Sequence, residues 1–97
     1  MVFKKEVTAK LGRKIICSLT CIIKETKNQY TKVKANKYLD YYINSYKLCL
    51  SKKSYTIDNI KEIIDFCNEC YEDANVFTYA EDLEYGLKEL VENIINQ

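Results

Sequence analysis

The sequence predicts an all-α fold, a small antiparallel four-helix bundle. Three observations support this prediction. The chain contains no proline and only two glycines, apolar residues recur at steps of three and four over most of its length, and the segments between these stretches are short. Because proline and glycine are the residues that most often interrupt helices, long helices are permitted nearly everywhere. At 97 residues the chain has the size of one small domain, and we expect residues 1–97 to form a single helical domain.

The second half of the chain carries the clearest helical periodicity. From residue 57 onward one stripe, with acidic residues opposite it, consists of Ile57, Ile60, Ile64, Cys67 and Tyr71. Thr56 fits the N-cap of this helix. Thr78 and Glu81 match a capping box that opens a last helix. The apolar stripe of that last helix consists of Leu83, Leu87, Leu90, Val91 and Ile94.

The first half predicts two more helices, one of them less clearly. Residues 31–51 place one apolar face at helical spacing, formed by Ala35, Leu39, Tyr42, Tyr46, Cys49 and Leu50. Residues 3–25 fit two patterns, because a helical stripe runs from Val7 to Ile22 while Ile15 to Ile23 also alternate as in a strand. The alternative is therefore an α+β domain with an N-terminal β-hairpin packed on three helices. A hairpin turning near Gly12 lacks the Asn-Gly type of turn signal, so helix is favoured.

Charge is divided sharply along the chain. Residues 1–53 carry thirteen Lys or Arg against three acids, a net +10, and residues 54–97 carry two Lys against eleven acids, a net −9. Such asymmetry bears on partners and association rather than on the fold.

Catalysis is not predicted. The chain has no histidine, which is the commonest general base, and no Ser or Cys has an evident base beside it. Neither Gly12 nor Gly86 belongs to a phosphate-binding loop. We therefore expect a non-enzymatic protein with no catalytic residue and no cofactor. No apolar run approaches the roughly 20 residues that cross a bilayer, so no membrane partner is expected.

The five cysteines could suggest a metal site. Cys67 and Cys70 form a C-x-x-C motif, and Cys17 with Cys21 could complete a zinc site from another helix. Both motif cysteines fall within a predicted helix, however, whereas zinc ligands of this spacing usually lie on turns. We expect four buried or half-buried thiols and no metal. An odd number of cysteines without an export signal indicates reduced thiols in a cytoplasm.

Two charged helix faces are candidate binding surfaces, although ordinary solvated surface is the alternative for each. The basic face lies on the second helix and comprises Lys34, Lys37, Tyr41 and Leu48. The acidic face lies on the last helix and comprises Glu81, Asp82, Tyr85, Glu89 and Glu92.

These features predict a small protein-binding module in the cytoplasm, acting as an inhibitor, immunity factor or regulator. Richness in Lys, Asn, Ile and Tyr reflects A/T-rich codons, so we expect an origin in a phage, a mobile element or a low-GC bacterium. The alternative is a nucleic-acid-binding protein that uses residues 1–53. With Arg13 as its only arginine, the chain is poorly equipped to read a DNA sequence. Association into a homo-oligomer is a further alternative.

Overall fold

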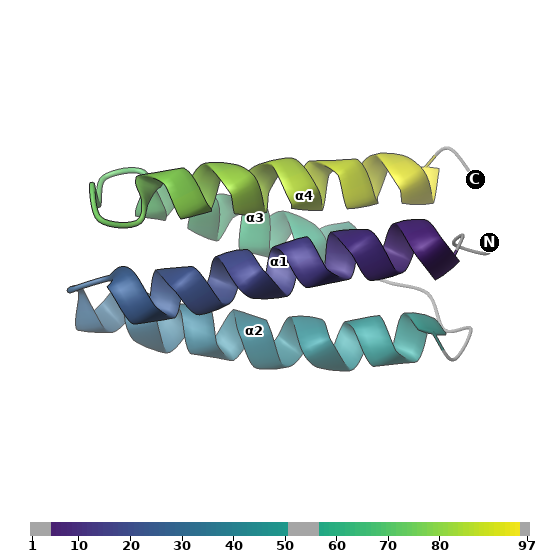
Figure 1. Ribbon diagram of the computed structural model, residues 1–97, viewed down its shortest axis with the longest axis horizontal. Coiled ribbons are helices and arrows are strands. Elements are labelled where there is room, and N and C mark those ends of the chain that lie inside the picture. Colours follow the sequence, from purple (N-terminus) through teal and green to yellow (C-terminus); the bar gives the residue numbers. More distant parts are fainter. Residues whose placement is uncertain (1–4, 51–56, 96–97) are drawn as a thin grey trace.

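The protein is a four-helix bundle in a computed structural model (Figure 1). The structure describes residues 5–50 and 57–95, with the side chains of residues 10–40, 42–43 and 60–92. The helices are α1 (Lys5–Glu25), α2 (Gln29–Leu50), α3 (Ile57–Cys70) and α4 (Phe77–Ile95). The all-α prediction is confirmed.

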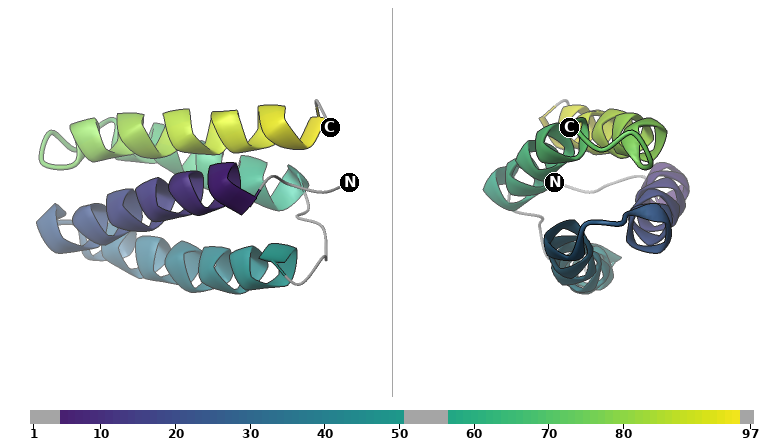
Figure 2. Two further views of the ribbon diagram at one scale, coloured as in Figure 1. Left: turned by 45° about the vertical axis from the view of Figure 1, so that its right-hand side comes forward. Right: turned by 90° about the vertical axis from the view of Figure 1, so that its left-hand side faces the viewer.

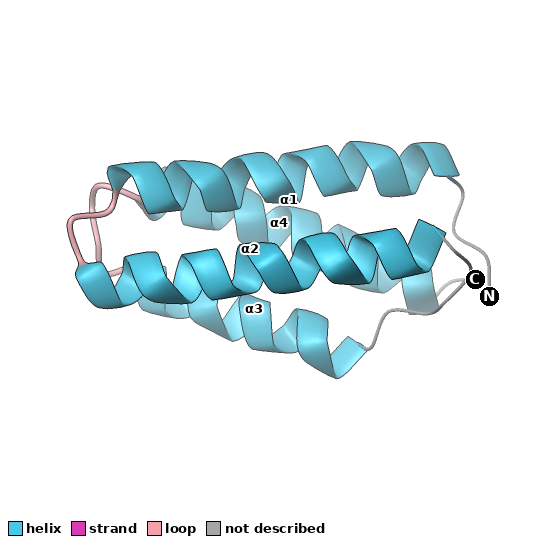
Figure 3. Cartoon of the chain, turned by 90° about the horizontal axis from the view of Figure 1, so that it is seen from below, coloured by secondary structure: helices cyan, strands magenta, loops and turns pink. Residues whose placement is uncertain are grey.

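The helices run up, down, up and down. The turns at residues 26–28 and 71–76 lie together at one end of the bundle (Figure 3). In the end-on view of Figure 2, α1 lies between α2 and α4, and α3 packs against α4. The basic helices α1 and α2 are therefore neighbours, as are the acidic helices α3 and α4, and the two charged halves meet along the α1/α4 and α2/α3 seams.

The hairpin alternative is wrong, because residues 5–25 form one continuous helix. Leu11, Ile15 and Ile22 are all buried, at spacings that a helix brings to one face. Gly12 is itself buried inside this helix instead of forming an exposed turn.

One hydrophobic core receives side chains from all four helices. The α3 stripe is wider than predicted, since Ile63, Phe66 and Cys70 are buried while Ile64 and Tyr71 are only partly buried. The physical reason is that α3 faces α4 on one side and α2 on the other. An apolar face shared between two neighbours spans more of the helix than a single stripe.

Two helix starts also differ from the prediction. Helix α4 begins at Phe77, so Thr78 already lies in its first turn and the predicted capping box does not open the helix. The buried Val76 starts α4 instead, because its carbonyl accepts the hydrogen bond from the Ala80 amide at 2.9 Å. Helix α2 begins at Gln29, two residues earlier than predicted. The predicted N-cap of α3, Thr56, lies outside the described residues.

Hydrogen bonds join the two turns at this end of the bundle, which we call the closed end. We call the four residues that form them the polar clasp: Thr26, Asn28, Asp73 and Asn75. The buried Thr26 donates its hydroxyl hydrogen to Asp73 Oδ2 at 2.9 Å and accepts a hydrogen bond from the Asn28 amide at 3.2 Å. Asp73 Oδ1 accepts from the Asn75 amide at 3.0 Å. The hydrogen bond from Asn75, together with that from Thr26, lowers the pKa of Asp73 below its ordinary value of 3.8.

This clasp should make stability depend on pH in acid. The pKa of Asp73 is lower in the folded chain than in the unfolded chain, so its contribution is complete above the unfolded value and is lost as pH falls through the folded value. We expect the melting temperature of the wild type to fall more between about pH 5 and about pH 2 than that of Asp73→Asn, which cannot ionise. The Glu72→Gln variant controls for loss of a neighbouring exposed carboxylate. Parallel melting curves for the wild type and Asp73→Asn would contradict the assignment.

Candidate binding surfaces

The acidic face predicted on α4 is a continuous outer surface. Four of its five residues are exposed and Glu89 is half-buried: Glu81, Asp82, Tyr85, Glu89 and Glu92. They are turned outward because Leu83, Leu87 and Leu90 on the opposite side of α4 are fully buried. The structure therefore brings these residues together as the pattern indicated.

Tyr85 is positioned by a cation from the neighbouring helix. Lys14 of α1 places its Nζ 4.5 Å from the centroid of the Tyr85 ring, a distance at which the ammonium is attracted to the π face. The ring nevertheless stays 59% exposed. Tyr85 is thus oriented by α1 and still available to a partner.

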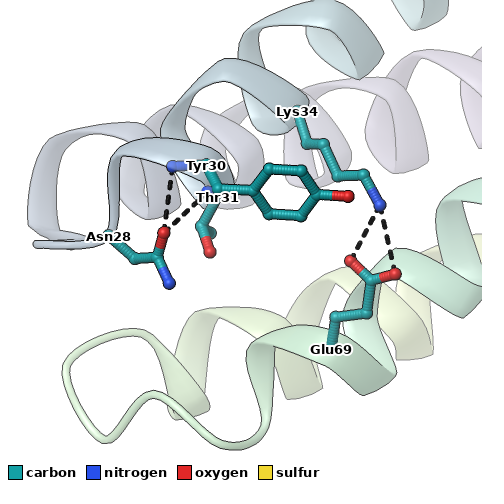
Figure 4. A network of polar contacts seen from close by, with 5 residues as sticks. All are labelled: Asn28, Tyr30, Thr31, Lys34 and Glu69. Carbon is teal, nitrogen blue, oxygen red and sulfur yellow. Dashed lines mark hydrogen bonds and ion pairs between the residues drawn. The ribbon is translucent and has the colours of Figure 1, made fainter.

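The basic face predicted on α2 is not a free surface at Lys34. This side chain lies at the α2/α3 seam, where its Nζ donates to Glu69 Oε1 at 3.1 Å and Oε2 at 3.0 Å (Figure 4). Hydrogen bonding with Tyr30 and with Glu69 raises the pKa of Lys34, so it remains a cation. Lys34 of the predicted basic face therefore belongs to the α2/α3 seam, because α3 supplies a carboxylate beside it.

The other predicted members of the basic face are less informative. Lys37 is exposed, with its Nζ 5.6 Å from the centroid of the Tyr38 ring. Tyr41 and Leu48 lie on α2, but their side chains are outside the described part of the chain. Of the two members whose side chains the structure describes, Lys37 is exposed and Lys34 is half-buried.

Two exposed apolar residues on α2 were missed by the sequence reasoning. Tyr30 is 65% exposed and Val33 is 58% exposed. The signal that could have found them is Asn28, a good N-cap residue. Its Oδ1 accepts hydrogen bonds from the amides of Tyr30 at 2.9 Å and Thr31 at 3.3 Å. Starting the helix at this cap includes Tyr30 in it, and the phase of the buried Ala35, Tyr38 and Tyr42 then places Tyr30 and Val33 off the core stripe.

The thiols do not all behave as expected. Cys67 and Cys70 are buried and Cys21 is half-buried, but Cys17 is exposed, so its predicted burial is wrong. Cys17 lies on the solvent side of α1, four residues after the exposed Arg13. Among the described residues, no group of three or more His, Cys, Asp or Glu side chains could hold a metal ion.

Thiol reactivity should follow this difference in exposure. Burial raises the pKa of Cys70 to about 11 and raises that of Cys67 further, so neither forms the reactive thiolate at neutral pH. We expect iodoacetamide to label Cys17 in the native protein, and Cys67 and Cys70 only after unfolding. Peptide mass spectrometry over a time course measures the order, and denatured protein is the control. Early labelling of Cys67 in native protein would contradict it.

Comparisons with protein-family models, with curated proteins and with solved structures gave no match. No helix in the described part of the chain is long and apolar enough to span a bilayer.

Proposed function

We propose that this protein is a small non-enzymatic protein-binding module whose acidic α4 face binds a cationic surface of a partner protein. The observation that carries the proposal is the row of exposed carboxylates around one exposed, oriented tyrosine, Tyr85. Tyrosine is a favoured interface anchor, and surrounding charges steer the encounter and select the partner.

The ion pairs within the bundle favour the acidic face of α4 over the basic face of α2 as the binding surface. On α2, Lys34 is already bound by Glu69 of α3. On α4, Lys88 lies 3.7 Å from Glu84, on the side of the helix that faces α3. Lys88 therefore pairs with Glu84, which is not part of the acidic face, and Glu81 and Glu92 of that face are exposed. A carboxylate-lined face of this kind suits an inhibitor, an immunity factor or a regulator that occupies the cationic site of a larger protein.

The test is a pull-down from the lysate of a low-GC bacterium at moderate and high salt. One bait carries Glu81→Gln, Tyr85→Ala and Glu92→Gln on α4. A matched control bait carries Glu62→Gln and Asp65→Asn, which remove two exposed carboxylates from α3. The wild type and the α3 bait should retain the same protein at moderate salt and the α4 bait should lose it. Equal retention by all three baits, or no captured protein, would reject the proposal.

A second candidate function, nucleic-acid binding, rests on α1. Lys10, Arg13 and Lys24 are exposed along this helix. Non-specific phosphate binding by such a row must weaken steeply with salt. Mobility shifts on single- and double-stranded DNA and RNA across a salt series test it. Replacing these three residues by Gln should abolish a shift that they cause.

A further inference from the structure

An exposed apolar patch lies on α2 near the closed end of the bundle. Tyr30 and Val33 are three residues apart and both mostly exposed, and the exposed Lys37 follows one turn later. We call these three residues the α2 patch. Clustered exposed apolar side chains beside polar ones are typical of interaction surfaces, whereas isolated ones are not.

Tyr30 is held in place before any partner arrives. Asn28 fixes its backbone by accepting its amide hydrogen, and the ammonium of Lys34 lies 4.9 Å from the centroid of its ring. Glu69 holds that ammonium with both carboxylate oxygens, as Figure 4 shows. A side chain that is already ordered loses less conformational freedom on binding, so Tyr30 is suited to anchor an interface.

The α2 patch and the acidic α4 face point in different directions. In the end-on view of Figure 2, α2 and α4 occupy opposite corners of the bundle, since α1 lies between them. The two surfaces therefore cannot contact each other within one chain. Two complementary surfaces on different sides of one molecule form heterologous contacts, which build rings or open chains instead of closed two-fold dimers.

We infer that the α2 patch binds the acidic α4 face of a second copy of this protein, so that copies associate head to tail. Charge complementarity selects this occupant, because α2 offers the cation Lys37 and α4 offers carboxylates. Each surface also presents an exposed tyrosine, Tyr30 or Tyr85, whose ring is held by a lysine. The inference rests on the proposed function, since it uses the same α4 face. Self-association and partner binding therefore compete.

Analytical ultracentrifugation of the full chain tests the inference. At low salt the average mass should rise steadily with concentration up to about 1 mM, reach about twice the monomer mass or more, and show no plateau at the dimer. The average mass should return to that of the monomer near 0.5 M salt, because salt then screens exposed charges that lie more than about 5 Å apart. A wild type that stays monomeric at all concentrations, or that stops at a dimer, overturns the inference.

Two variants separate head-to-tail contact from other modes of association. One carries Val33→Asp and Lys37→Glu in the α2 patch, and the other carries the neutral replacements Glu81→Gln, Tyr85→Ala and Glu92→Gln on α4, so that the two altered surfaces do not attract each other. All five positions are exposed, so folding should be retained, as circular dichroism checks. Each variant alone should be monomeric, because each retains one half of the contact. Their equimolar mixture should form a one-to-one pair and nothing larger, since the variant with an intact α4 face can bind the variant with an intact α2 patch.

The mass of the mixture tests the head-to-tail contact independently of the lysate experiment. A mixture that remains monomeric, or that grows beyond the pair, overturns the head-to-tail contact. Failure of the proposed function has a different signature, in which the α4 bait and the wild type capture the same protein. Loss of lysate capture on the α4 bait combined with a strictly monomeric wild type would leave the proposed function standing and reject this inference.

Discussion

Replacing Phe66 by alanine is expected to lower the free energy of unfolding by about 3–5 kcal/mol, the usual cost of emptying a buried aromatic site. Phe66 is 2% exposed on α3, and its ring centroid lies 5.2 Å from that of Tyr38 on α2, with the rings tilted by 50°. Close backbone approach occurs for the α1/α2, α1/α4 and α3/α4 pairs. In the described part of the molecule, the α2/α3 seam therefore depends on long side chains, and this aromatic pair bridges it.

Urea unfolding followed by circular dichroism measures the Phe66→Ala effect. Small domains are stable by only about 5–15 kcal/mol, so the variant should be visibly destabilised and could be partly unfolded without denaturant. Phe66→Leu conserves most of the volume and should cost less than about 1.5 kcal/mol. Asn68→Ala, at an exposed position of the same helix, should change stability by less than about 0.5 kcal/mol. Equal stability of the Ala variants at 66 and 68 would show that Phe66 does not hold the seam.

Helix number and the separation of charge were predictable because each depends on local sequence. Apolar spacing and the absence of proline define helices without reference to their neighbours. The predicted α3 stripe nevertheless left out Phe66, although Ile60, Ile63, Phe66 and Cys70 also follow steps of three and four. A helical wheel describes one helix, whereas the width of its buried face depends on how many neighbours it has.

The candidate surfaces were predicted unequally for a related reason. The acidic residues of α4 lie opposite its buried stripe, where any bundle leaves them exposed. Lys34 lies at the edge of the α2 stripe, where the neighbouring helix decides its surroundings, whereas Tyr30 lies off the stripe. Glu69 of α3 draws Lys34 into the seam, and Lys34 in turn holds the Tyr30 ring. No pattern within α2 alone contains that information.

Helices α1 and α4 approach each other closely at Gly86, where a large residue should be poorly tolerated. A Cβ at this position would lie 3.3 Å from Cγ1 of Ile15, which is fully buried, and 3.7 Å from Cδ of Lys14. Alanine gains about 1 kcal/mol of helix propensity over glycine but crowds Ile15, so the two effects oppose each other. We expect Gly86→Ala to change the free energy of unfolding by less than about 1 kcal/mol in either direction.

Gly86→Leu should instead destabilise the protein by about 2–3 kcal/mol, because the added branched side chain must displace the fully buried Ile15 and protein cores are closely packed. Leucine has nearly the helix propensity of alanine, so the difference between the two variants isolates overpacking from backbone effects. Thermal and urea unfolding measure that difference, and Glu92→Leu at an exposed position of α4 is the matched control. Gly86→Leu should also shift α1 and so move Lys14 away from Tyr85. Tyrosine fluorescence measures this change once the signal of the other tyrosines, given by the Tyr85→Phe variant, has been subtracted. Stability of Gly86→Leu equal to that of Gly86→Ala would show that α1 and α4 do not approach as closely as Gly86 and Ile15 indicate.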